Sequence, residues 1–175
     1  QTRTSIVNDG APLIEKIEEK VSLPTSTKVR LMVRLLPYMF PLAAVYFGEY
    51  LINQAISPVL LFKGSDFSGK EYKYYQVLYQ VGVFISRSSV NLVPIKTILL
   101  LQLPAIFQLI NAVFLSFVAV YNFIPSIYII FAIIFWEGLL GGSIYVNTFY
   151  LMSQNFQGAE KEFCLGSTSM SYGLS

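Results

Sequence analysis

The chain has 175 residues and a net charge of +2 at pH 7; 54% of its residues are apolar and 13% are charged, against about 25% charged in soluble domains. It contains no histidine, the commonest general base and metal ligand, and its single cysteine, Cys164, can form no internal disulfide. The few basic residues are too dispersed for a nucleic-acid surface. We therefore expect no enzyme activity, no catalytic residues, no metal site, no cofactor and no nucleic-acid partner.

Residues 1–28 are polar and are predicted to form a linker with a short amphipathic helix over Pro12–Val21. Proline suits the first helical position, and the apolar residues of this segment fall on one helix face. No basic segment followed by a short apolar core marks a signal peptide. The chain starts at Gln1 rather than Met and stops within a helical pattern at Ser175, so we interpret it as a piece of a longer protein.

Residues 29–175 are predicted to form a polytopic bundle of transmembrane helices. Residues 97–136 contain no Asp, Glu, Lys or Arg, whereas about 20 apolar residues are enough to cross a bilayer. The predicted spans are 29–58, 72–86, 97–121 and 127–151, followed by an incomplete helix from 163. Pro37 and Pro41 are expected to kink or loosen the first span. The second span is short and amphipathic, so other helices or an aqueous cavity should shield it.

The distribution of basic residues predicts the orientation in the membrane. If the loops alternate between sides, the Lys63–Lys73 loop holds three of the twelve basic residues and the other side holds the rest. The positive-inside rule then places the N-terminal segment in the cytosol and the Lys63–Lys73 loop in the lumen or outside the cell.

Glu49, in the first span, is a candidate for substrate binding or proton coupling. A carboxyl within a span is costly and should face the bundle interior or water. Asn53 is four residues further on, so the two side chains share a helix face and Asn53 is a candidate for the same site. A purely structural carboxyl, hydrogen-bonded to a neighbouring helix, is the alternative for Glu49.

Glu137 is the second candidate, near the middle of the fourth span. Tyr145 lies on the same face and is also assigned to a substrate or proton site. Gly138 and Gly142 form a small-xxx-small pair, which allows close approach of another helix. Arg87, after the second span, is either a cytosolic topology anchor or a gating contact between helix ends.

Three stretches resemble the battenin family of lysosomal and vacuolar membrane proteins. They are YFGEYLINQ at 46–54, YQVLYQVGVFISRSS at 75–89, and EGLLGG at 137–142 followed by YVNTF at 145–149. The resemblance extends from about Leu36 to the C-terminus. It implies a major-facilitator-like fold of two six-helix halves, of which this chain would hold the central cytosolic linker and the first five helices of the second half.

Gly82, Ser86 and Arg87 match the spacing of the major-facilitator loop motif Gly-x-x-x-Asp-Arg, with Ser in place of Asp. The resemblance also implies a multi-pass protein of the vacuolar or lysosomal membrane that acts in organelle pH homeostasis and in the balance or export of basic amino acids and glycerophosphodiesters. Its implied partners are the lipid bilayer, a small solute, protons, and the missing N-terminal half of the same fold. The alternative is a non-transporting membrane scaffold that affects vesicle traffic and organelle pH indirectly.

Overall fold

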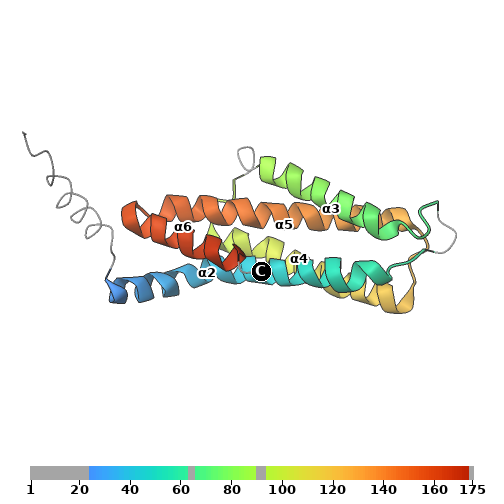
Figure 1. The fold of residues 1–175 in the computed structure, drawn as a ribbon, viewed down its shortest axis with the longest axis horizontal. Helices are drawn as coiled ribbons and strands as arrows, with labels where there is room; N and C mark the ends of the chain where they lie inside the picture. Colours follow the sequence, from blue (N-terminus) through green and yellow to red (C-terminus); the bar gives the residue numbers. More distant parts are fainter. Residues whose placement is uncertain (1–23, 63–65, 90–93, 174–175) are drawn as a thin grey trace, which may run out of the picture. The chain divides into compact units, whose positions relative to one another are not determined.

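The structure is a computed structural model that describes residues 24–62, 66–89 and 94–173. These residues form helices and contain no strand, which confirms the all-α class (Figure 1). The helices are α2 (Thr25–Tyr50), the π-helix η1 (Leu51–Ile56), the 3₁₀ turn η2 (Ser57–Val59), α3 (Glu71–Ser88), α4 (Ile98–Tyr121), α5 (Ile127–Asn155) and α6 (Gly158–Gly173). The amphipathic helix predicted over Pro12–Val21 lies outside the described residues.

Among the described residues, three helical stretches are long and apolar enough to cross a membrane: Thr25–Val59, Ile98–Tyr121 and Ile127–Asn155. They occupy the predicted spans at 29–58, 97–121 and 127–151. α3 covers the predicted span at 72–86 but does not belong to this set, because polar side chains such as Gln76 and Gln80 lower its hydropathy. That α3 crosses the bilayer stays a prediction.

The last two helices differ from the predicted boundaries. α5 continues to Asn155 and α6 begins at Gly158, before the predicted start at 163. The polar composition of this segment resembles a long loop, but Phe156 is buried and Gly158 adopts a positive φ of 54°. Glycine tolerates this left-handed conformation, so the chain turns within two residues.

The described residues divide into two compact units, one formed within 24–35 and 156–173 and the other within 36–155. In the first unit, the Arg34 guanidinium lies 5.5 Å from the centre of the Phe156 ring. The second unit holds the candidate site described below. Its core is formed by buried residues of η1, α3, α4, α5 and the turns between them: Ile52, Ile56, Leu60, Tyr75, Tyr79, Val83, Ala112, Leu115, Val118, Ile124, Ile127, Ile130 and Ile134.

α2 continues through both of its prolines. Pro41 has no N–H group, so the carbonyl of Pro37, four residues earlier, receives no helical hydrogen bond. Gln102 of α4 donates its Nε2 to this carbonyl at 3.3 Å. A neighbouring helix thus replaces the bond that the proline removes, as apolar surroundings require.

α3 and α5 approach each other closely along a row of glycines. A Cβ on Gly138 would collide with the carbonyl oxygen of Tyr79, and one on Gly142 would lie 2.7 Å from that of Val83. On α3, a Cβ on Gly82 would lie 2.5 Å from the carbonyl oxygen of Phe135. The Ser86 hydroxyl donates to the Leu139 carbonyl at 2.7 Å. This contact fixes the register of α3 on α5.

Candidate functional site

Asn53 is the centre of a polar network that joins three helical segments of the second unit. It lies in the π-helix η1, with its side chain 6% exposed. Its Nδ2 donates to Glu137 Oε1 of α5 at 2.9 Å and to the backbone carbonyl of Glu49 at 3.1 Å. Its Oδ1 accepts a hydrogen bond from Gln76 Nε2 of α3 at 3.0 Å. The amide therefore has a fully used donor group and a used acceptor.

The π-helix itself places Asn53 at this point. The N–H of Ser57 bonds to the carbonyl of Ile52, five residues earlier, which widens the turn that carries Asn53. Single π-turns inside longer helices are frequent at functional sites. Ile52 and Ile56, on either side of Asn53, are both in the core, so hydrophobic burial holds the widened turn in place.

Glu137 is completely buried at 0% exposure. Oε1 is bonded to Asn53, whereas Oε2 has no hydrogen-bond partner among the described residues. Gln108 of α4 is also 0% exposed, lies close enough to interact with Glu137, and likewise lacks a hydrogen-bond partner for both amide atoms within the described part of the chain. Buried polar groups are normally paired. In this cluster, the binding of a proton or a change of side-chain position therefore has a large effect on the energy of the unpaired groups.

Gln108 fits between the helices because Gly48 of α2 has no side chain. A Cβ on Gly48 would lie 2.9 Å from Gln108 Cγ. Glycine at this position of α2 thus makes room for the buried amide.

Glu49 is half-buried and lies at the edge of the same cluster. A Cβ on Gly141 of α5 would lie 3.1 Å from Glu49 Oε2 and 3.7 Å from the hydroxyl of Tyr79. Glu49 and Glu137 are near enough to act on each other electrostatically, and Arg87 acts on Glu49 in the same way. Two carboxyls in this proximity disfavour double ionisation, so the protonation of one depends on that of the other.

Arg87 and Tyr145 form a pair at the end of α3. The Arg87 guanidinium lies 4.5 Å from the centre of the Tyr145 ring, a distance typical of a cation–π interaction. Tyr145 thus contacts Arg87 from the same face of α5 that carries Glu137 and Gly141.

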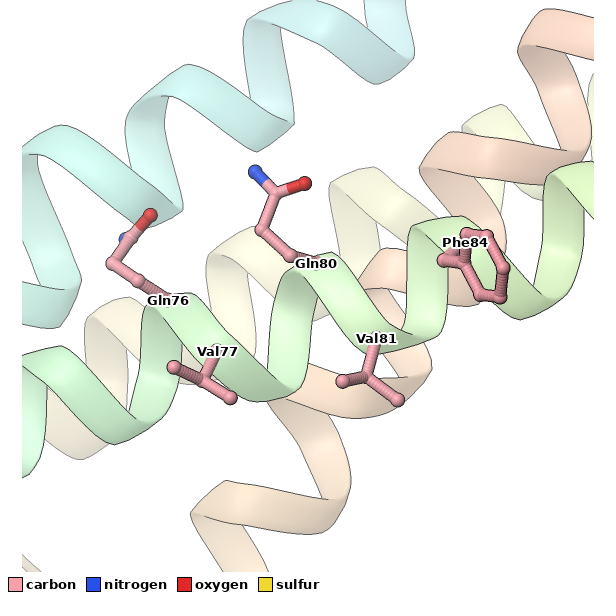
Figure 2. Close-up of a pocket in the computed structure, with 5 residues that line it drawn as sticks. All are labelled: Gln76, Val77, Gln80, Val81 and Phe84. Atoms are coloured by element: carbon pink, nitrogen blue, oxygen red, sulfur yellow. The ribbon is translucent and has the colours of Figure 1, made fainter.

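A cavity of about 160 Å³ opens beside Glu49 and Asn53, between the α2–η1 segment and α3. Its walls are Tyr46, Glu49, Tyr50, Asn53, Gln54, Gln76, Tyr79 and Gln80. Figure 2, drawn around a second pocket that Gln76 and Gln80 also line, shows that both amides point toward the α2–η1 segment, while Val77 and Val81 point away from it. The polar network is therefore reached from one side through amide and tyrosine side chains.

The structure brings Glu49, Asn53 and Glu137 together. The four-residue spacing placed Asn53 on the helix face of Glu49; its side chain bonds to Glu137 and to the backbone carbonyl of Glu49. Helical spacing indicates a shared face, whereas the tertiary partner on α5 cannot be read from it. Gln76 and Gln108 were not assigned to the site. The available signal was that each is an amide within an apolar or amphipathic helix.

A family model described as CLN3 protein matches residues 2–174. This chain belongs to the CLN3 protein family. Among its relatives, protein btn-1 of Neurospora crassa is 52% identical over 77% of the chain, and protein BTN1 of Eremothecium gossypii is 43% identical over 91% of it. Battenin of Canis lupus familiaris is 38% identical over 91% of the chain. The predicted battenin-family membership is confirmed.

These alignments cover 29%, 40% and 37% of the three relatives, so the chain spans little more than a third of their length. No solved structure matches it. With three stretches able to cross a bilayer, this member of the CLN3 protein family is an integral membrane protein.

Proposed function

We propose that this chain forms part of a vacuolar or lysosomal membrane transporter in which at least one of Glu49 and Glu137 couples proton movement to solute movement. The observation that carries the proposal is the buried network of Glu137, Asn53 and Gln76, which adjoins Glu49 and a cavity. Carboxyls within membrane helices commonly mark ion and proton pathways. This network connects such a carboxyl to a surface that a solute can reach.

The geometry supports coupling through the helices that the network joins. Glu137 is on α5, Asn53 on η1 and Gln76 on α3. A change in the charge of Glu137 alters the strength of its bond to Asn53, because hydrogen bonds to charged acceptors are the stronger ones. The position of η1 against α3 and α5 then depends on protonation, and the cavity lies at this boundary.

The proposed architecture is a major-facilitator-like transporter, of which this chain supplies the linker and the first five helices of the second half, with the N-terminal segment in the cytosol. In such transporters the substrate site lies near the bilayer midplane, and rocking of the two halves alternates access. The solutes proposed from the family resemblance are basic amino acids and glycerophosphodiesters, with organelle pH homeostasis as the consequence.

The test is uptake of arginine and of a glycerophosphodiester into sealed vesicles that contain the full-length protein, measured against pH. Glu137→Gln and Glu49→Gln keep the shape and can still hydrogen-bond, but they cannot titrate. We expect at least one variant to reach the membrane in normal amount and to lose the pH dependence of uptake.

Because Asn53 bonds to the carboxylate of Glu137, we expect the larger loss in Glu137→Gln. If both variants keep the pH dependence, neither carboxyl is the coupling group and both are structural. If the wild-type protein transports neither solute while vesicle traffic depends on it, the scaffold alternative replaces the transporter.

A further inference from the structure

The orientation of the Asn53 amide is fixed by its neighbours. Its Oδ1 faces the donor Nε2 of Gln76, and its Nδ2 faces two acceptors, Glu137 Oε1 and the Glu49 carbonyl. Turning the amide over would oppose donor to donor at Gln76 and acceptor to acceptor at the two oxygens. With Gln76 as the donor to Oδ1, Asn53 is the donor to Glu137, and Gln76 is the residue that favours this orientation.

This fixed orientation decides which oxygen of Glu137 can carry a proton. Oε1 accepts the hydrogen bond from Asn53 in either protonation state. A proton on Oε1 would compete with the Nδ2 donor for the lone pairs of that oxygen, so we assign the proton to Oε2. Oε2 is buried and has no hydrogen-bond partner among the described residues.

Gln108 is the side chain placed to serve this oxygen. It is 0% exposed, its Cγ occupies the space left by Gly48, and it lies near enough to interact with Glu137. An amide can bond to a carboxyl in both of its states. Its Oε1 accepts from the protonated Oε2–H, and after a half-turn its Nε2 donates to the ionised Oε2.

We propose that Gln108 is the positioning residue for the proton of Glu137: it bonds to Oε2 in both protonation states and reverses its amide each time the proton binds or leaves. This inference rests on the proposed function, since it assigns a partner to the coupling carboxyl. Gln108 does not itself titrate.

The other groups that face Glu137 do not provide this partner. Glu49 approaches from α2 as a second carboxyl, and α3 contributes the Tyr79 hydroxyl near Glu49 and the Arg87 cation that acts on Glu49. α4 contains no ionisable side chain before Tyr121. α5 adds Tyr145, which lies against Arg87.

Gln108→Leu tests the proposal, because leucine has a similar size and cannot hydrogen-bond. The ionised carboxyl loses the stronger bond, so we expect the midpoint of the uptake-against-pH curve to move to higher pH by about one unit. Gln102→Leu is the matched control. It removes an amide from the same helix, one that donates to the Pro37 carbonyl outside the site, and should leave the midpoint unchanged.

A second readout does not depend on transport. The infrared C=O stretch of protonated Glu137 can be assigned in the full-length protein by its loss in Glu137→Gln. We expect this band to move in Gln108→Leu and to stay in place in Gln102→Leu.

The outcomes separate the two proposals. If Glu137→Gln abolishes the pH dependence of uptake but Gln108→Leu leaves both the midpoint and the infrared band where Gln102→Leu leaves them, Gln108 is structural and the inference fails alone. If Glu137→Gln and Glu49→Gln both keep the wild-type pH dependence, the proposed function fails; the infrared band then decides whether Gln108 still bonds to Oε2. Should Gln108→Leu not reach the membrane, Gln108→Met, with a flexible side chain of similar length, is measured in its place.

Discussion

The two sides of α5 are held in opposite ways. Toward α3, the contact is made of backbone atoms and glycines, with Gly138 and Gly142 leaving no room for a side chain. Toward η1 and α4, the contact combines apolar core residues with polar side chains, namely Asn53 against Glu137 and the nearby Gln108. A backbone contact at this distance has one register, whereas a hydrogen bond between side chains can change partners. We infer that α3 and α5 act as one rigid element and that the α2–η1 segment and α4 are the parts able to adjust against it.

Gly138→Ala is expected to cause the largest loss of stability, because it acts on the contact between α3 and α5. The added methyl group meets the carbonyl oxygen of Tyr79, a backbone atom that cannot rotate away. Overpacking typically costs 1–3 kcal/mol and occasionally more, and we expect about 3 kcal/mol or more here. Unfolding of the purified protein in detergent measures the loss.

Gly166→Ala is the control for this prediction, because it adds a methyl group to a helical glycine with nothing within 4 Å. Alanine favours a helix by up to about 1 kcal/mol over glycine, so this variant should be as stable as wild type or slightly more stable. Equal stabilities for the Gly138 and Gly166 variants would show that the glycine contact is not rigid.

Asn53→Leu tests the polar contact between η1 and α5. It removes the donor to Glu137 and the acceptor for Gln76, leaving buried polar atoms unpaired at a cost of about 1–3 kcal/mol. We expect a smaller loss of stability than for Gly138→Ala, together with a change in the pH dependence of uptake. If the variant loses stability but keeps the wild-type pH dependence of uptake, Asn53 has a structural role and does not take part in coupling.

Arg87→Lys should have the smallest effect on stability. Lysine keeps the charge but loses the planar guanidinium that stacks on Tyr145. Such contacts contribute about 0.5–1 kcal/mol at exposed sites, so if Arg87 gates transport, uptake falls about two- to five-fold with normal membrane insertion. Tyr145→Phe keeps the aromatic ring and serves as the control. Wild-type uptake in Arg87→Lys would leave Arg87 as a topology anchor.

Much of the fold could be predicted because apolar composition determines where helices cross a bilayer. Residues 97–136, which carry no charge, contain the whole of α4 and the first ten residues of α5. The start of α6 could not be predicted, because a two-residue turn at Phe156 and Gln157 depends on the conformation of Gly158 rather than on polarity. The π-helix at 51–56 has no sequence signature either, since it results from how Ile52 and Ile56 are buried.

The candidate site was predicted in part. Glu49 and Glu137 stand out because carboxyls are rare in membrane helices. The bond from Asn53 to Glu137 could not be predicted, because a four-residue spacing identifies a helix face but not the helix that covers it. Gln108 could be assigned to the site only from its position in the structure, near Glu137 and against Gly48.

The bond from Gln102 to Pro37 has a consequence for the synthesis of the protein. The two residues are 65 positions apart in the sequence. At translation rates of 5–20 residues per second, roughly 3–13 s separate them at the ribosome. During this interval α2 carries a backbone carbonyl that lipid cannot satisfy. We therefore expect α2 to remain beside the insertion machinery, or to be held by a membrane chaperone, until α4 is made, so that a single proline would influence the order in which the helices enter the lipid.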